Sequence, residues 1–416
     1  MDGALRFVAR KSMNKRGEGL LLLMVHNYYR EPGGEDAVFE AEANLLARHG
    51  HRIERVTIHN DGIPDDLGAV GRVQLAARTL WSRQTYQEVR SRRHRLKPDM
   101  ALFHNTFPLI SPSAYGACRE ARVPVVQTLH NYRLICPNAT FFRDGRLCED
   151  CLGKTPPWPG VLHACYRNSR SQTAVVAAML TGHRLRRTWA RDVDVYIALT
   201  EFARQKFVQG GLPADRVVVK PNFVHPDPGV GAHDGNFVLF VGRLATNKGV
   251  ETLLRAWELL EGPVPLRIVG DGPLAWLVQR AGDSRPTIKY EGRLARNAVV
   301  ALMREARALI FPSGWYECFP LTILEAFACS LPVIASRLGA MAEIVDDGRT
   351  GFHFAPGDVA DLAAKVKWAW THPHEMRCMG MEARREYETK YTAERNYSLL
   401  MQVYERAMEV AKERRP

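Results

Sequence analysis

Two acidic residues, Glu317 and Glu325, are separated by seven residues within the otherwise apolar stretch WYECFPLTILEAFACSLPV (residues 315–333). Pro320 is typical of a helix start, and helix-forming residues continue from there until Pro332. The apolar neighbours predict a largely buried helix. A buried carboxylate needs a partner, because desolvating an unpaired charge is unfavourable by several kcal/mol. Two solvated side chains are the simpler interpretation, and a polar ligand at the helix N-terminus is the functional one.

A second set of polar side chains follows three predicted strands of the first half, at residues 20–26, 99–105 and 123–131. Each strand ends in the dipeptide His-Asn, namely His26-Asn27, His104-Asn105 and His130-Asn131. Ligands of parallel α/β sheets bind at the carboxyl ends of the strands. The three pairs therefore predict a floor of hydrogen-bonding groups for a polyhydroxylated ligand, although a single strand-end histidine is more often structural.

Glycines and cations at other strand ends favour a phosphate-bearing ligand. Gly33 and Gly34 lie between the first strand and the next helix, where bare amides suit a phosphate. Arg243 and Lys248 lie between a later strand and helix, where cations can clamp a pyrophosphate. Gly270 belongs to the tight turn IVGDGP, where the backbone can approach a flat ring. Ordinary surface cations are the alternative for Arg243 and Lys248.

Four cysteines have the spacing of a metal site. Cys136, Cys148, Cys151 and Cys165 form the pattern C-x11-C-x2-C-x13-C. A CxxC pair with two outlying thiols suits tetrahedral zinc, and His163 is a substitute ligand. Four reduced cysteines in an irregular loop are the alternative. A redox CxxC is disfavoured because no thioredoxin-like unit surrounds it. The sequence thus predicts a structural zinc ion.

The strands and helices that must position these residues are predicted to form two similar α/β domains. A chain of 416 residues with 46% hydrophobic and 25% charged residues is long enough and globular enough for two cores. Apolar strands alternate with helices, which predicts parallel sheets covered on both faces. The pattern restarts after a Pro- and Gly-rich linker at 221–236. We predict one domain at 1–225, completed by a terminal helix at 392–416, and a second at 236–391.

The formal net charge of +12 is confined to the first half of the chain. Residues 1–222 hold 33 Lys and Arg against 21 Asp and Glu, and the remainder holds 24 of each. The densest basic segment includes Arg78, Arg83, Arg90, Arg92, Arg93 and Arg95, interspersed with Trp81 and Tyr86. This segment predicts contact with an anionic membrane surface. A solvated helix face and an acidic substrate are the alternatives. No nucleic-acid motif is present, so we expect no nucleic-acid partner.

Taken together, these segments resemble the glycosyltransferases of family 4, which are retaining enzymes of the GT-B architecture. The resemblance is carried by PGGEDAVFEAEANLLARHGH, FVGRLATNKGVETLLRAW, IVGDGP, YEGRL and WYECFPLTILEAFACSLPVIAS, the last of which contains the Glu-x7-Glu motif. It implies an α/β fold of two Rossmann-like, doubly wound domains that face each other across a cleft. The first would bind the acceptor and the second the nucleotide sugar.

The resemblance also implies roles for the charged residues. Glu325 would hold the ribose hydroxyls of a sugar nucleotide. Glu317 and His130 would lie beside the transferred sugar as catalytic residues. Arg243 and Lys248 match the diphosphate clamp of the family. The other residues of the strand-end pairs fall on the acceptor side, namely His26, Asn27, His104, Asn105 and Asn131.

Main-chain groups complete the implied donor site. Gly34, with Gly33, matches the loop over the phosphates. Leu294 falls where the nucleotide base lies, and the amides near Leu321 and Thr322 would meet the diphosphate. Placed cations and amides can stabilise the departing diphosphate, so we expect no cofactor for catalysis. An acid committed to ribose argues against a hydrolase with two catalytic carboxylates.

The resemblance therefore implies a retaining, metal-independent hexosyltransferase. It would move a sugar from a nucleotide-diphosphate sugar to a glycan or lipid-linked acceptor in bacterial-type surface polysaccharide synthesis. A sugar-nucleotide epimerase would instead convert the donor alone, and a non-catalytic partner subunit would bind the nucleotide without turnover. A zinc-bearing nucleic-acid binder is the weakest alternative. We expect a cytoplasmic protein that is peripheral on the inner face of the cell membrane.

Overall fold

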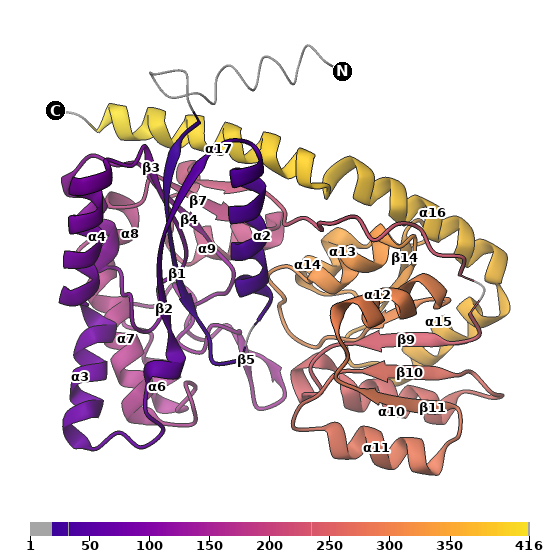
Figure 1. Cartoon of the computed structure of the whole chain (residues 1–416). Coiled ribbons are helices and arrows are strands. Elements are labelled where there is room, and N and C mark those ends of the chain that lie inside the picture. The colour runs from indigo at the N-terminus through magenta and orange to yellow at the C-terminus, as the bar shows by residue number, and fades with distance from the viewer. Residues whose placement is uncertain (1–18, 32, 234, 415–416) are drawn as a thin grey trace. The chain divides into compact units, whose positions relative to one another are not determined.

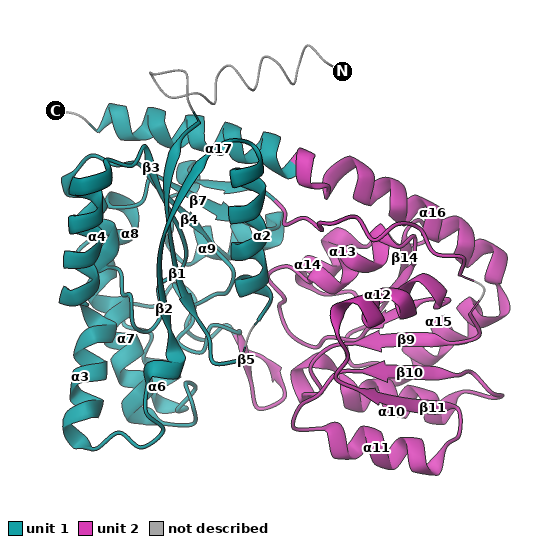
Figure 2. Cartoon of the chain, viewed as in Figure 1, with its two compact units in different colours: residues 1–140, 149–220, 396–416 teal, residues 141–148, 221–395 magenta. Residues whose placement is uncertain are grey.

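The structure, a computed structural model, describes residues 19–31, 33–233 and 235–414 (Figure 1). The chain forms two compact units (Figure 2). Unit 1 comprises residues 1–140, 149–220 and 396–416, and unit 2 comprises residues 141–148 and 221–395. Residues 1–18 of the predicted first domain and residues 415–416 of the predicted terminal helix lie outside the described residues.

Unit 1 is built around a sheet of six strands in the order β2-β1-β3-β4-β7-β8, and every neighbouring pair is parallel. Strands β1, β3 and β4 are buried along almost their whole length, as predicted for apolar runs in a doubly covered sheet. The strands are β1 (Leu21–Tyr28), β2 (Arg52–His59), β3 (Met100–Asn105), β4 (Val125–Thr128), β7 (Val195–Ala198) and β8 (Val217–Val219).

Helices connect the parallel strands of unit 1, and α2 and α4 lie on opposite sides of β1 in Figure 1. Parallel neighbours require such crossovers, so the carboxyl ends of β1, β3 and β4 meet at one edge of the sheet. That edge carries the three predicted His-Asn pairs. The helices are α2 (Gly34–Arg48), α3 (Ala69–Leu80), α4 (Arg83–Leu96), α5 (Ser113–Glu120), α6 (Trp158–Leu162), α7 (Arg170–Leu185), α8 (Thr188–Arg191), α9 (Glu201–Gln209) and most of α17 (Ala393–Glu413).

Unit 2 repeats the design with six parallel strands in the order β11-β10-β9-β12-β13-β14. Alternate residues of β9 enter two separate apolar cores, Leu239 on one face and Phe240 on the other. The sheet is therefore doubly wound. The strands are β9 (Val238–Val241), β10 (Leu266–Val269), β11 (Ile288–Gly292), β12 (Leu309–Phe311), β13 (Val333–Ser336) and β14 (Gly351–Phe354). The helices are α10 (Val250–Leu259), α11 (Ala275–Ser284), α12 (Arg296–Glu305), α13 (Leu321–Ala328), α14 (Gly339–Ile344), α15 (Val359–Thr371) and α16 (Pro373–Lys390).

The helix predicted between the two acids is α13, which begins at Leu321 directly after Pro320. It ends four residues before Pro332, because Ser330 adopts a left-handed φ of 65° that a helix cannot continue through. Ile323, Leu324 and Phe327 are fully buried, as the apolar sequence predicted. Across the described ranges, no helix is both long and apolar enough to cross a bilayer.

Candidate active site

Lys248 is positioned by a short turn that follows the central strand β9 of unit 2 and leads into α10. It ends the 3-10 helix η3 (Thr246–Lys248), and Gly249 follows with a φ of 74°. A Cβ atom on Gly249 would lie 1.9 Å from the Pro312 carbonyl oxygen. Only glycine therefore allows this turn to pack against the end of β12, close to the loop that carries Glu317.

Glu317 lies in the loop between β12 and α13 and is only 7% exposed. Its Oε1 accepts hydrogen bonds from Lys248 Nζ at 2.7 Å, Ser313 Oγ at 2.8 Å and Trp315 Nε1 at 2.6 Å. The buried carboxylate does have a charged partner, and that partner belongs to the protein. Lys248 is ion-paired with Glu317, and its assignment to a diphosphate stays a prediction. Sequence reasoning missed Ser313 and Trp315, although both lie within four residues of the acid.

Glu325 lies in the second turn of α13 and forms an ion pair with Arg296, whose Nη2 is 3.3 Å from its Oε1. Burial raises the pKa of Glu325, and Arg296 opposes this shift. The acid side chain retains 22% exposure, so it is accessible from solvent. Arg296 begins α12 and was not singled out from the sequence. Leu294, the predicted base contact, packs against the apolar core to which α13 contributes.

The remaining donor-site candidates of unit 2 lie in turns at the carboxyl edge of its sheet. Gly270 has a φ of 146°, and a Cβ there would lie 1.8 Å from the Gly242 carbonyl oxygen. This close approach packs the turn after β10 against the turn that contains Arg243. Leu321 and Thr322 form the first turn of α13, which has no side-chain N-cap. Their amides belong to the N–H groups that have no partner inside a helix.

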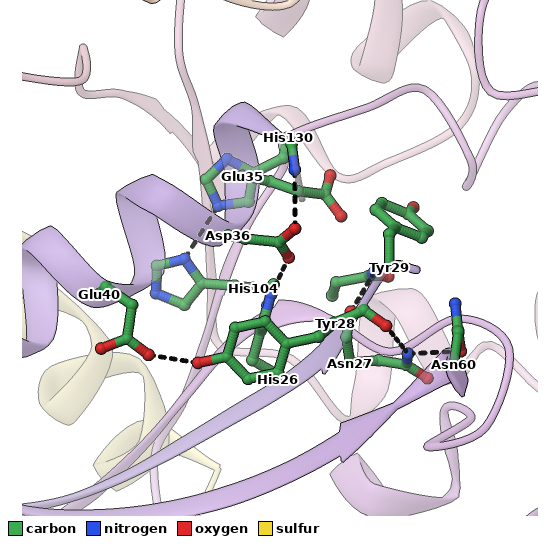
Figure 3. A network of polar contacts seen from close by, with 12 residues as sticks. His26, Asn27, Tyr28, Tyr29, Glu35, Asp36, Glu40, Asn60, His104 and His130 are labelled. Carbon is green, nitrogen blue, oxygen red and sulfur yellow. Dashed lines mark hydrogen bonds and ion pairs between the residues drawn. The ribbon is translucent and has the colours of Figure 1, made fainter. Parts of the chain in front are cut away.

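In unit 1, an acidic side chain accepts a hydrogen bond from the backbone at the start of α2. Asp36 Oδ2 accepts the Gly33 amide at 2.8 Å, and its Oδ1 is 2.7 Å from His26 Nε2 (Figure 3). Glu35 and Asp36 both occupy the first turn of this helix. The Gly33 amide, which we expected to bind a phosphate, is therefore engaged with Asp36. Gly34 begins the helix, and its assigned role stays a prediction.

Glu35 is a titratable group that sequence reasoning missed. Its Oε2 accepts a hydrogen bond from Asn131 Nδ2 at 3.0 Å, and its Oε1 is buried. Burial raises the pKa of Glu35 to about 7, against the hydrogen bond from Asn131. A carboxyl group that titrates near neutral pH and bonds Asn131, the residue after His130, is suited to proton exchange. The only indication of Glu35 in the sequence was its position directly after Gly33 and Gly34.

Most of the strand-end pairs lie in the interior of unit 1. Asn105 Nδ2 donates to the Asn27 carbonyl at 2.8 Å, and Asn27 Nδ2 donates to Asn60 Oδ1 at 2.8 Å (Figure 3). The Asn27 and Asn105 side-chain oxygens accept backbone amides of the loop after β3, from Leu109 and Phe107 respectively. These buried amides hold that loop. His26 and His104 are buried as well. Fewer of the predicted side chains are therefore accessible to a ligand.

His130 and Asn131 are the pair that stays partly exposed. His104 Nδ1 lies 2.9 Å from His130 Nε2, and the two rings stack with centroids 5.1 Å apart (Figure 3). Burial lowers the pKa of His130 well below its usual value. His130 is thus a neutral imidazole at neutral pH.

In the sequence, the four cysteines of the predicted zinc site flank a small hairpin of β5 (Phe142–Arg143) and β6 (Arg146–Leu147). Cys136 and Cys151 are buried, and Cys151 Sγ accepts the Gly160 amide at 3.2 Å. In the part of the chain that the structure describes, no group of three or more His, Cys, Asp or Glu is arranged to hold a metal. Zinc binding stays a prediction, which elemental analysis of protein purified without added metal would test.

The basic segment divides into engaged and exposed arginines. Arg78 Nε donates to the Leu109 carbonyl at 2.9 Å. Arg92 pairs with Glu54 at 2.7 Å and with Glu88 at 2.6 Å. Both side chains are therefore engaged within unit 1, and we do not include them among the arginines proposed to contact the membrane. Arg93 is partly buried, and three of the predicted arginines are exposed, namely Arg83, Arg90 and Arg95.

Comparison with known proteins places the chain in a family. Residues 33–222 match the family described as "Glycosyl transferase 4-like domain", and residues 235–372 match the family "Glycosyl transferases group 1". The chain belongs to the glycosyltransferases of the GT-B fold. Its two parallel-sheet units are the two Rossmann-like domains that define this fold, as the sequence predicted.

Individual relatives of this GT-B glycosyltransferase cover parts of the chain. The glycogen synthase of Mycobacterium tuberculosis is 34% identical over 40% of the chain and 42% of its own length. The phosphatidyl-myo-inositol mannosyltransferase of Mycobacterium leprae is 32% identical over 53% of the chain and 61% of its own length. The chain thus spans less than two thirds of either relative. Anabaena HepE in complex with UDP-glucose superposes with a TM-score of 0.61 at 18% identity, over 95% of the chain and all of HepE, which supports the fold.

Proposed function

We propose that this protein is a retaining family 4 glycosyltransferase that moves a sugar from a nucleotide-diphosphate sugar to a glycan or lipid-linked acceptor. The observation that carries the proposal is the arrangement around α13. Glu317, which is ion-paired with Lys248, lies in the loop before α13. The first amides of α13 have no side-chain cap, and Glu325 lies in the second turn of this helix. Charged groups and open amides thus gather at the carboxyl edge of a parallel sheet, where α/β proteins bind nucleotides.

The chemistry follows from these groups. Departure of the nucleotide diphosphate leaves negative charge, which Arg243, Lys248 and the α13 amides are suited to stabilise. A bound diphosphate would compete with Glu317 for Lys248, so donor binding would free the carboxylate to face the sugar. The acceptor hydroxyl attacks the anomeric carbon from the face that the diphosphate leaves, and the leaving phosphate takes the hydroxyl proton. The configuration is retained, and no metal is required in this scheme.

Relatives support the substrate class. The M. leprae relative is named for a lipid acceptor, and the HepE structure contains UDP-glucose. We therefore propose a nucleotide-diphosphate hexose as donor and synthesis of a surface polysaccharide or glycolipid as the role. Neither the base nor the sugar of the donor follows from these names.

A panel of sugar nucleotides tests the proposal. We expect one of them to stabilise the protein by about 2.7 kcal/mol at 100 times its Kd, which raises Tm by roughly 5–10 °C. The same compound should release its nucleotide faster when acceptor glycans or lipids are added. Conversion of the donor to another sugar nucleotide without acceptor would identify an epimerase. Stabilisation without any turnover would identify a non-catalytic binding subunit.

We also propose that unit 1 contacts an anionic membrane surface. The exposed Arg83, Arg90 and Arg95 lie on α4, and Trp81 at its start is 45% exposed. On the preceding helix, the apolar side chains of Val70 and Val73 are exposed too, by 71% and 68%. Exposed apolar side chains and arginines on consecutive helices fit the boundary between lipid headgroups and acyl chains.

Vesicle co-sedimentation tests this contact. We expect binding that grows with the fraction of anionic lipid and falls with salt. Each arginine near such a surface contributes about 1 kcal/mol, so changing Arg83, Arg90 and Arg95 to glutamine should weaken binding roughly 100-fold. The matched control changes three exposed arginines of unit 2 to glutamine, namely Arg255, Arg280 and Arg377. Equal binding by both triple variants would contradict the assignment.

A further inference from the structure

A chain of buried polar contacts connects the candidate catalytic histidine to the places where the polypeptide leaves and re-enters unit 1. Lys220 Nζ lies 3.1 Å from Asn396 Oδ1 and 3.5 Å from Glu42 Oε2. Glu42 Oε1 lies 3.3 Å from His104 Nε2, and His104 contacts His130 as described. Lys220 is the last residue of unit 1 before unit 2, and Asn396 is the first after the return.

The charges along this chain balance only if His104 is neutral. Lys220 and Glu42 are each 1% exposed, so a charge on either must be compensated by the other. Burial opposes ionisation of Glu42, but the positive charge of Lys220 outweighs it and lowers the pKa of Glu42 to about 2. A proton added to His104 would place a second positive charge beside the balanced pair, in a site that is 3% exposed.

With His104 neutral, the positions of the protons follow. An ionised carboxylate accepts hydrogen bonds only, so the ring nitrogen that faces Glu42, His104 Nε2, must carry the hydrogen. His104 Nε2 makes no well-aligned hydrogen bond in the described structure, but Glu42 Oε1 lies 3.3 Å away, and a bare nitrogen there would face a negative oxygen. His104 Nδ1 is then bare and accepts, so the donor across the 2.9 Å contact is His130 Nε2–H. The other nitrogen of His130, Nδ1, is left bare.

We propose that Glu42, held in place by Lys220, is a positioning residue that fixes His130 with its bare Nδ1 available to accept a hydrogen bond from a hydroxyl of the transferred sugar. The inference rests on the proposed function in placing the sugar at His130. It makes His130 a hydrogen-bond acceptor, not a donor. A donor sugar with a hydroxyl at this point is favoured over one with an ether or a deoxy carbon, because a buried acceptor left unpaired is unfavourable.

His26 provides an internal reference. Its Nε2 contacts Asp36 at 2.7 Å, and its Nδ1 is buried without a partner in the described structure. It should therefore hold the same tautomer as His104 and His130, but through Asp36 and independently of Glu42.

Nitrogen-15 NMR of the whole protein, labelled at histidine, tests the inference directly, because the two ring nitrogens have different shifts when protonated or bare. We expect His26, His104 and His130 to be neutral at pH 7 with the hydrogen on Nε2. His130 protonated on Nδ1, or an imidazolium at His104, would overturn the proposal. This measurement needs no substrate, so it stands apart from any failure to find a transferase reaction.

A double variant, Glu42→Leu with Lys220→Met, removes both charges together and avoids leaving one of them buried alone. We expect His104 and His130 to become mixtures of tautomers while His26 is unchanged. Partners that orient metal-ligating histidines are worth about 10- to 100-fold in activity, and we expect a similar fall in kcat here with nucleotide affinity unchanged.

The control variant is Glu40→Gln. Glu40 lies on the same helix and bonds Tyr28 and Arg55 instead of His104, so it should leave all three tautomers and turnover as they are (Figure 3). An unchanged His130 tautomer and kcat in a folded double variant would overturn the role of Glu42. If the double variant fails to fold, the tautomers of the unmodified protein still decide the proposal.

Discussion

Replacing Glu317 with glutamine is expected to lower the rate of sugar transfer by at least about 100-fold, the usual loss when one preorganised charge interaction is removed from an active site. Glutamine keeps an oxygen that can accept from Ser313 and Trp315, so the loop should retain its structure. It removes the charge that holds Lys248 Nζ at 2.7 Å. The lysine would then lose its fixed position before the donor arrives.

The measurement compares kcat and donor Kd of this variant with those of Glu258→Gln, a change at an exposed position of α10. We expect kcat to fall and Kd to change by less than about fivefold, because in the proposed complex Lys248 binds the diphosphate and the freed Glu317 carboxylate acts on the reacting sugar. Transfer near the original rate, with Glu258→Gln also unaffected, would remove Glu317 from the mechanism.

Replacing Glu325 with glutamine is expected to weaken donor binding by roughly 10- to 100-fold, because hydrogen bonds from ribose hydroxyls to a charged carboxylate contribute about 1.5–3 kcal/mol. Arg296 supplies the matched comparison. It pairs with Glu325 at 3.3 Å and would compete with the ribose, so Arg296→Gln should leave donor affinity unchanged or slightly higher. Equal losses in both variants would mean that the ion pair serves stability and that the ribose binds elsewhere.

The pH dependence of donor binding gives the same assignment a second test. Burial raises the pKa of Glu325 above its usual range, so the carboxylate takes up a proton at a higher pH than an ordinary glutamate does. Donor affinity that depends on the charged form should be full at pH above the raised pKa and fall as the pH drops through it. The Glu325→Gln variant should show no such fall. Titration calorimetry between pH 5 and 8 measures both curves.

Local features of the sequence predicted much of the fold. Apolar runs gave the buried strands β1, β3 and β4, since a strand covered on both faces has no polar side to display. Pro320 marked the start of α13 because its fixed φ and missing amide suit a helix start. Glycine marked the tight turn at Gly270, because its φ of 146° excludes other residues.

The candidate site was predicted unevenly. Glu317, Glu325, Lys248 and His130 were singled out because charged or ring side chains at strand ends are rare and conspicuous. Arg296 and Glu42 were not, because a single charged residue on a helix is ordinary in sequence and nothing local shows which partner it meets. The sequence also placed Asn27 and Asn105 on a ligand surface, whereas they hold the loop after β3.

The sequence by itself determined the elements of this protein, their order and the residue types at the strand ends. The tertiary structure alone decided which of those residues meet. Lys248 reaches Glu317 because β9 and β12 are neighbours in the sheet, although 69 residues separate the two side chains. Glu42 meets Lys220 across 178 residues in the same way, through packing of α2. Such pairs depend on strand order and on burial, which makes an unpaired charge unfavourable, and neither is encoded in any local stretch of the chain.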